Sequence, residues 1–380
     1  MLKNMKAKIF ILAILLTQIC FAIPEQSLIT INKTQFKNTS LETYFSSSYL
    51  VEDSKQNKAN VLRLKAGVDL SQKWSSTFKF DLNANFSLES GRTDSLYDNS
   101  HWEPSNDFSS NRAEFVWQPL KMIELKAGAI NLKDLDSRLL LRRTAFLGTK
   151  ETLQYSNDTL SIGVYGLQTI PNNRNYSNRL DEVDEGMPVF YMEGITLDYH
   201  SQRFRFKGHI SKFAYDNLSN SVAGASIFHG NSVNRTDDKN GEFVYSYIGT
   251  TSAAQVDLTI SHFTFSTRAD YVINESAPSD NEAYSFGFQS LFNYNDVNYS
   301  IELENFRSEA DASVAYYNST WYGHNNSYGQ GMTFEIENEQ MQTKYSLSFR
   351  RAKEIVPNQR TETETDDLIS FKLRKAYEIF

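Results

Sequence analysis

Residues 74–89 read WSSTFKFDLNANFSLE, and from Phe78 onward they alternate between apolar and polar side chains. The apolar positions are Phe78, Phe80, Leu82, Ala84, Phe86 and Leu88. The polar positions between them are Lys79, Asp81, Asn83, Asn85, Ser87 and Glu89. Successive side chains of a β-strand point to opposite faces, so this segment predicts a strand with one apolar face and one charged face.

The same two-faced pattern recurs along most of the 380 residues, with no helical layer to cover the apolar faces. A large membrane barrel turns its apolar face outward to lipid and its polar face inward to water. We therefore predict an all-β fold, a transmembrane antiparallel β-barrel of about 16 strands with short periplasmic turns and long extracellular loops. A soluble one-sided sheet assembly, such as a propeller or a β-helix, is the alternative, but no internal repeat of fixed period supports it.

The composition agrees with a barrel. Hydrophobic residues make up 40% of the chain and the mean hydropathy is -0.49, which is too polar for a bundle of membrane helices. In a barrel only every second strand residue meets lipid. The chain has 26 Phe and 21 Tyr, residues that favour strands and that form the aromatic girdles of membrane barrels.

The N-terminal 22 residues predict a secretory signal peptide, because lysines precede an apolar run that ends with small residues at Cys20 and Ala22. Lipidation of Cys20 is the alternative. Cleavage after Ala22 removes the one cysteine and three lysines, which changes the formal net charge from -8 to -11. This acidic balance argues against a nucleic-acid partner. We expect a periplasmic lead-in over 23–40 and the barrel over 41–380.

The signal peptide, the strand pattern and the C-terminal segment Tyr377, Glu378, Ile379 and Phe380 together resemble the Gram-negative outer-membrane porins. The resemblance covers the mature chain and is architectural rather than based on a motif. It implies an integral protein of the outer membrane that contacts lipid and lipopolysaccharide. It also implies that the barrel-assembly machinery reads the C-terminal strand, and that the protein is a homotrimer.

In porins the third long loop folds into the lumen and narrows it, and here the third loop is 131–149. The resemblance therefore implies a pore constriction whose opposed charges order water and select solutes. Its charged residues are Lys133, Asp134, Asp136, Arg138, Arg142 and Arg143. The alternative is an external loop with a short amphipathic helix that contacts another subunit.

The polar faces of the strands supply candidate lumen charges of both signs. They are Arg63, Lys65, Lys79, Asp81, Arg112, Glu114, Glu124, Lys126, Arg205, Lys207, Arg268, Glu302, Glu304, Lys344, Arg350, Lys372 and Arg374. Anions are favoured if the basic residues Arg138, Arg142, Arg143, Arg205 and Lys207 converge. The net charge of -11 favours cations instead.

We predict a water-filled porin channel for passive diffusion of small hydrophilic solutes and ions, with no cofactor and no enzymatic activity. An adhesin or receptor barrel with a closed lumen is the first alternative, and a barrel enzyme is the second. Aromatic residues of the loops suggest a channel that stacks sugars as a further variant. These residues are Trp102, Tyr316, Tyr317, Trp321, Tyr322 and Tyr328.

Overall fold

The computed structural model describes residues 38–53, 57–95, 106–135, 138–141, 145–171, 186–227, 229–234, 241–318, 320–322, 325–356 and 365–378. The predicted signal peptide, most of the lead-in and the terminal residues Ile379 and Phe380 lie outside these ranges. Within them, no helix is long and apolar enough to cross a membrane.

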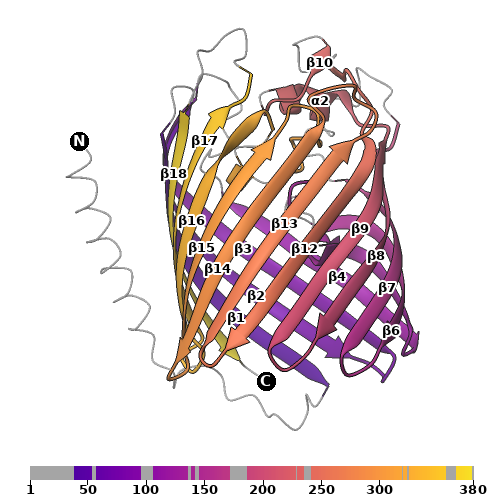
Figure 1. Ribbon diagram of the computed structural model, residues 1–380, viewed down its shortest axis with the longest axis vertical. Helices are drawn as coiled ribbons and strands as arrows, with labels where there is room; N and C mark the ends of the chain where they lie inside the picture. Colours follow the sequence, from indigo (N-terminus) through magenta and orange to yellow (C-terminus); the bar gives the residue numbers. More distant parts are fainter. Residues whose placement is uncertain are drawn as a thin grey trace, which may run out of the picture.

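In the described part of the chain, sixteen antiparallel strands close into one barrel, which confirms the predicted fold class (Figure 1). The first strand pairs with the last, with Tyr49 opposite Phe371. In order around the barrel the strands are β1 (Thr39–Asp53), β2 (Asn57–Lys73), β3 (Phe78–Ser95), β4 (Asp107–Leu120), β5 (Ile123–Asn131), β6 (Ala145–Ser156), β7 (Leu160–Ile170), β8 (Val189–His200), β9 (Phe204–Asp216), β12 (Ile248–Ile260), β13 (Phe263–Asn274), β14 (Glu282–Tyr294), β15 (Val297–Ser308), β16 (Ser327–Asn338), β17 (Thr343–Glu354) and β18 (Thr365–Glu378).

Short elements lie in the longer connections. The 3-10 helix η3 (Leu132–Leu135) follows β5, and the 3-10 helix η5 (Thr320–Tyr322) precedes β16. Between β9 and β12 come the helix α2 (Asn220–Ile227) and a two-stranded sheet of β10 (Val233–Asn234) and β11 (Glu242–Phe243). Figure 1 shows α2 and β10 at the end of the barrel opposite the end where β18 finishes.

The connections at the β18 end are tight turns. The side-chain oxygen of Asn157 accepts hydrogen bonds from the backbone N–H groups of Thr159 and Leu160, at 3.0 and 2.8 Å, and so closes the turn between β6 and β7. Ser261, between β12 and β13, has a φ of 55°, which a tight two-residue turn requires. The prediction of short turns at one end and long connections at the other is therefore confirmed.

The barrel has the inverse polarity of a soluble protein. On β3, Phe86 and Leu88 are 47% and 44% exposed, whereas Asp81 and Asn85 are only 4% and 3% exposed. Phe86 and Leu88 thus form part of the outer wall, whereas Asp81 and Asn85 face the interior. Such a wall is suited to lipid outside and water inside.

Two predicted boundaries were wrong. The alternation of residues 243–260 predicts one long strand, but β11 ends at Phe243 and β12 begins at Ile248. Between them Tyr247 is buried, and its hydroxyl donates to Asp311 at 3.2 Å. The loop predicted over 131–149 is shorter, because β6 already begins at Ala145.

The sequence did not mark the start of β6 as a strand, because its first residues are apolar on both faces and show no alternation. Phe146 is 1% exposed and its ring lies 6.2 Å from that of Phe190 inside the barrel. Its neighbour Leu147 is 56% exposed on the outer wall. At this level the interior of the barrel is apolar, so the alternation of apolar and polar residues disappears.

A lysine in place of Phe288, an outward residue of β14 that is 39% exposed, tests the lipid-facing wall. We expect this substitution to lower the free energy of unfolding by about 2–4 kcal/mol, because the charge would face lipid near mid-depth. Urea titration of the protein folded in lipid vesicles measures the loss. The matched control is Gln289→Lys, which places the same charge on the inner face. Equal losses in the two variants would contradict this orientation of the wall.

Candidate pore constriction

The connection between β5 and β6 folds into the barrel. Its leucines are all buried and belong to one apolar cluster: Leu132, Leu135, Leu139, Leu140 and Leu141. The cluster continues onto inward residues of the wall, among them Phe190 on β8, Phe213 on β9 and Val272 on β13. Burial of these leucines against the inner wall holds the loop inside the barrel.

Arg138 of this loop contacts the opposite wall. Its guanidinium lies 3.4 Å from the carboxylate of Glu302 on β15. Counted around the barrel, β15 is eight strands from β5 in either direction, which is half of the ring. The described residues of the loop therefore lie inside the barrel and reach its opposite wall.

A second connection, 309–326, meets the loop from the other side. The hydroxyl of Ser313 donates to the backbone carbonyl of Leu139 at 3.2 Å. The ring of Tyr317 stacks on that of Tyr215 at 5.7 Å and lies 5.4 Å from that of Phe146. The two connections thus form one packed layer across the interior of the barrel.

The expectation that the aromatic residues of 307–328 are external was wrong for most of the described ones. Tyr317 and Tyr322 are 4% and 2% exposed, since they pack in the apolar cluster. Trp321 and Tyr322 donate hydrogen bonds to the carboxylate of Glu304, at 2.9 and 2.8 Å. Tyr328 is exposed, and Trp102 lies outside the described residues.

Asparagine side chains connect a third segment to this layer. Asn231, which follows α2, accepts from the N–H of Ala315 at 2.8 Å and donates to the carbonyl of Ser313 at 2.9 Å. Asn325 also donates to the carbonyl of Ser313, at 2.6 Å. Because buried polar groups that are fully paired are rigid, these bonds fix the layer in one arrangement.

Asp311, in the connection between β15 and β16, is a buried carboxylate of this layer. Its oxygen accepts from the N–H of Ser232 at 2.9 Å and from the hydroxyl of Tyr247 at 3.2 Å. Burial raises the pKa of Asp311 above its ordinary value of 3.8, although both hydrogen bonds oppose the rise. The folded state therefore binds a proton more tightly than the unfolded chain, and this group makes stability fall as the pH rises through the interval between the two pKa values.

We expect Asp311→Asn to keep both acceptor contacts and to change the free energy of unfolding by no more than about 1 kcal/mol, while removing this pH dependence. Asp311→Leu should cost about 1–3 kcal/mol for each donor left unpaired. Chemical unfolding followed by circular dichroism between pH 4 and 8 measures both effects. An Asn variant as unstable as the Leu variant would contradict the role of Asp311 as an acceptor.

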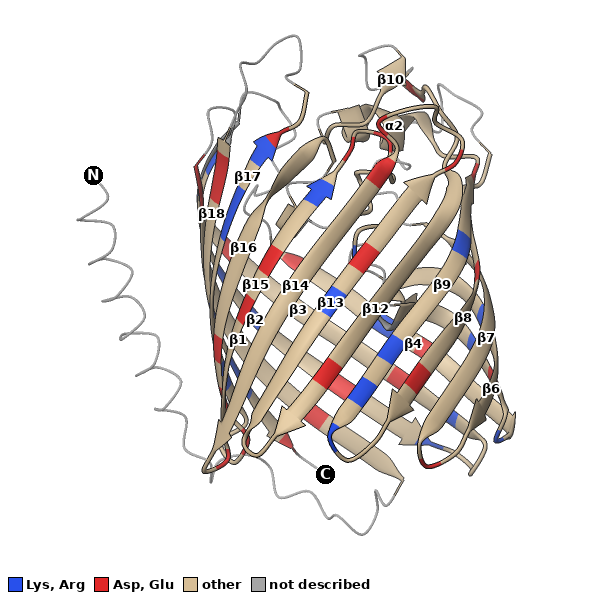
Figure 2. Cartoon of the chain, in the orientation of Figure 1, with Lys and Arg blue, Asp and Glu red and all other residues tan. Residues whose placement is uncertain are grey.

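Most of the predicted lumen cations are paired with carboxylates of the inner wall. Figure 2 shows residues of both signs distributed over the strands. The pairs are Arg63–Glu89, Lys79–Asp81, Arg112–Asp69, Lys126 with Glu114 and Glu124, Arg205–Asp198, Arg268–Asp270, Lys344–Glu335, Arg350–Asp366 and Arg374–Glu42.

Seven of these carboxylates were not among the predicted site residues: Glu42, Asp69, Glu89, Asp198, Asp270, Glu335 and Asp366. Glu89 is the cross-strand neighbour of Arg63, and Asp367, next to Asp366, is that of Arg351. Strand register decides such pairs, and the sequence alone does not fix the register. The one sequence signal for these seven carboxylates was their position on the polar face of their strands.

The remaining predicted charges divide into three groups. Lys65 and Lys372 also interact with neighbouring groups, and Lys207 is the cross-strand neighbour of Asp198. Glu302 and Glu304 join the loop contacts described above. Nothing is described for Asp136, Arg142, Arg143 or the side chains of Lys133 and Asp134.

The condition for an anion preference, convergence of the basic set, is not met by its described members. Arg205 and Lys207 lie near the start of β9, where Arg205 pairs with Asp198 at 2.6 Å. Arg138 pairs instead with Glu302 on β15, four strands further around the barrel. What the structure brings together is an arginine of the loop and a carboxylate of the opposite wall. Opposed charges of this kind orient water and charged solutes.

Comparisons with solved structures identify the fold. *Pseudomonas putida* OprB is 9% identical in sequence, with a TM-score of 0.59, and the match covers 91% of this chain and 96% of that one. *Salmonella typhi* OmpF, in a complex with daunomycin, is 11% identical with a TM-score of 0.52 over 89% and 97% of the two chains. No protein-family model and no curated protein matches the sequence. The chain therefore has the fold of the Gram-negative outer-membrane porins.

Proposed function

We propose that the protein is an outer-membrane channel through which small hydrophilic solutes and ions diffuse passively. The ion pair between Arg138 and Glu302 carries this proposal, because opposed charges that meet across the interior of a porin-type barrel suit a charged constriction. The inverted polarity of the wall supports a position in the membrane. The ion-paired inner wall supports a lumen that contains water.

The inner wall also suggests how the channel selects. Since the predicted cations are largely matched by carboxylates, the wall offers little uncompensated charge of either sign. Selection is then mainly by size at the layer formed by the two connections, with a local field at Arg138. Lipid and lipopolysaccharide surround the barrel, the assembly machinery reads its C-terminal strand, and the protein is a homotrimer.

Uptake of neutral sugars into vesicles that contain the folded protein tests the proposal. We expect the rate of vesicle swelling to fall steeply as the sugar becomes larger. No swelling with the smallest sugar, from protein shown to be folded by circular dichroism, would contradict a passive channel.

One observation favours a second function. The apolar cluster of the two connections and α2 fills part of the barrel interior, as expected of a receptor or adhesin with a closed lumen. The swelling experiment separates the two functions, because a closed barrel admits no sugar of any size.

A further inference from the structure

Gly331 on β16 has no side chain, and the indole ring of Trp321 occupies the space that a side chain would take. Gly331 is the cross-strand neighbour of Glu304 on β15 and of Arg350 on β17, which are both inner-face residues. A Cβ atom built at Gly331 would lie 2.5 Å from Cζ2 of Trp321, well inside the roughly 3.5–4.0 Å at which carbon atoms pack. The glycine therefore leaves a recess in the inner wall, and the ring of Trp321 lies in it.

Wall residues on three strands hold η5, the short helix that carries Trp321. The indole N–H of Trp321 donates to the carboxylate of Glu304 at 2.9 Å, and Nη1 of Arg350 donates to the backbone carbonyl of Trp321 at 3.4 Å. The hydroxyl of Ser327, the first residue of β16, donates to the carbonyl of Tyr322 at 2.6 Å. Because these bonds fix both the ring and the backbone of η5, the ring is held in one place.

The recess lies beside the candidate constriction. Glu302, which pairs with Arg138 of the loop, precedes Glu304 by two residues on β15, so both carboxylates lie on the inner face. Trp321 is half-buried, because one part of its ring packs on the apolar cluster and the rest is accessible from the interior. A ring at this place borders the route of a solute that passes the Arg138–Glu302 pair.

A glycine on the other side of Glu304 provides a comparison. Gly287 on β14 is also the cross-strand neighbour of Glu304, so it too lies on the inner face. A Cβ atom built there would be 3.8 Å from its nearest heavy atom, the carbonyl oxygen of Leu303, which is an ordinary contact. Space for a side chain is therefore present at Gly287 and absent at Gly331.

We propose that Gly331 and Glu304 are positioning residues that hold the indole of Trp321 against the wall and so keep the channel open beside Arg138. A ring that lost this seat would turn toward the centre of the barrel, because strands β15 to β17 close the wall behind it. The displaced ring would then reduce the cross-section through which solutes pass. Trp321 is thus a determinant of the size limit that is separate from the loop after β5.

The inference deepens the proposed function and rests on it for the effect on solutes, but the place of the ring can be measured in protein that conducts nothing. The full-length protein, labelled with 5-fluorotryptophan and folded in detergent, should give one fluorine resonance for each of its four tryptophans. The resonance that is lost in Trp321→Leu belongs to Trp321. We expect Gly331→Ala to shift this resonance, because the added methyl group displaces the ring.

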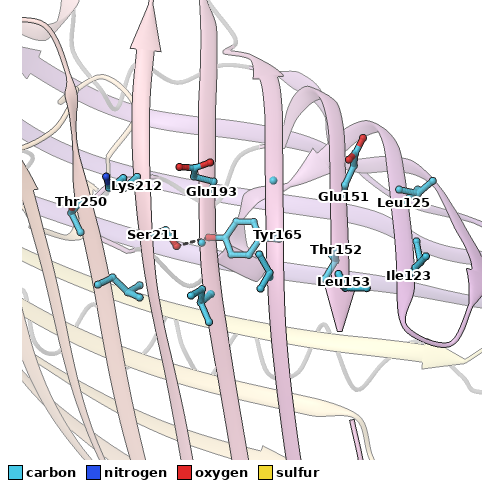
Figure 3. Close-up of a pocket in the computed structure, with 15 residues that line it drawn as sticks. Ile123, Leu125, Glu151, Thr152, Leu153, Tyr165, Glu193, Ser211, Lys212 and Thr250 are labelled. Atoms are coloured by element: carbon cyan, nitrogen blue, oxygen red, sulfur yellow. Dashed lines mark hydrogen bonds between the residues drawn. The ribbon is translucent and has the colours of Figure 1, made fainter. Parts of the chain in front are cut away.

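Two controls separate the recess from the general effect of replacing a strand glycine. Gly287→Ala adds the same methyl group on the opposite side of Glu304, where it fits. Gly166→Ala adds it on β7, in a hollow of about 770 Å³ in the barrel wall (Figure 3), where a built Cβ atom has no heavy atom within 4 Å. We expect neither control to move the Trp321 resonance or to change the conductance.

Single-channel conductance tests the effect of the ring on the channel. We expect Gly331→Ala to lower the conductance by about twofold, because the displaced ring narrows the constriction. Trp321→Leu should raise it, and the double variant Gly331→Ala with Trp321→Leu should conduct as Trp321→Leu does, because the added methyl group then meets no ring. A folded Gly331→Ala protein with an unmoved resonance, an unchanged or raised conductance, or the same loss of conductance in both backgrounds would overturn the proposal.

Variants of Glu304 cover the case in which Gly331→Ala does not fold. Glu304→Gln keeps an oxygen that accepts from the indole N–H, so the Trp321 resonance should stay in place, whereas Glu304→Leu removes the acceptor and should shift it. A folded Glu304→Leu protein with an unmoved resonance would show that Glu304 does not position the ring. Resonances that move as expected in protein that conducts nothing would contradict the proposed function alone. Conduction that none of these variants alters would contradict this inference alone.

Discussion

Replacement of Leu140 by aspartate should release the loop from the interior of the barrel and raise the single-channel conductance several-fold. Leu140 is 0% exposed and belongs to the apolar cluster. Truncation of a buried leucine alone costs about 2–5 kcal/mol, and an unpaired carboxylate in its place adds a desolvation penalty. Hydration of the aspartate then stabilises the released loop more than burial against the wall stabilises the folded-in loop.

The control for this experiment is Leu140→Met, which keeps the volume and the apolar character of the side chain and should cost less than about 1.5 kcal/mol. We expect its conductance to equal that of the wild type. If the Asp variant folds, as judged by circular dichroism, and conducts no better than the Met variant, then the loop does not limit the channel.

Reversal of the charge at Arg138 should shift the ion preference of the channel toward cations. In Arg138→Glu two carboxylates face each other where an ion pair with an N–O distance of 3.4 Å now lies. For unit charges about 4 Å apart, the interaction is roughly 4 kcal/mol at an effective dielectric constant of 20, so the change from attraction to repulsion alters the field at this point strongly. The reversal potential under a salt gradient measures the shift.

The double variant Arg138→Glu with Glu302→Arg rebuilds the pair in the opposite direction. It should return the reversal potential toward the wild-type value, since the sum of the two charges is restored. Arg205→Glu is a second control, because Arg205 is paired with Asp198 near the start of β9. An equal shift of the reversal potential in Arg205→Glu would mean that Arg138 does not control the ion preference more than other charges of the inner wall.

The alternation seen in residues 78–88, and its recurrence along the chain, were sufficient to predict a barrel, its inside and its outside. It works because the side-chain period of a strand is two, and because lipid and water impose opposite demands on the two faces. The prediction failed where those demands no longer differ. Phe146 and Leu147 are apolar on both faces because a folded loop, and not water, lies inside the barrel at that level.

The site was predicted less completely than the fold. The porin resemblance led to the loop and to Arg138, and the polar phase led to Glu302, but nothing in the sequence pairs two residues that are 164 positions apart. The inward fold of 309–326 was missed because aromatic residues such as Tyr317 suit an exposed loop as well as a buried layer. Both the Arg138–Glu302 pair and the burial of Tyr317 form only when the barrel closes, and closure depends on residues far apart in the sequence.

The outer face shows the same limit. Glu151, Glu193 and Lys212 stand in the outward phase of three strands, where the pattern predicts apolar residues. Only the pairing register places them in one row. A departure from the alternation is therefore informative once neighbouring strands are known.

Single-channel recording of the purified, folded protein in a planar lipid bilayer tests most directly whether the lumen conducts. We expect stable steps whose current is proportional to the applied voltage, with only weak preference for either ion because the inner-wall charges are paired. No current from protein that is demonstrably folded and inserted would contradict the channel and would favour a closed receptor or adhesin.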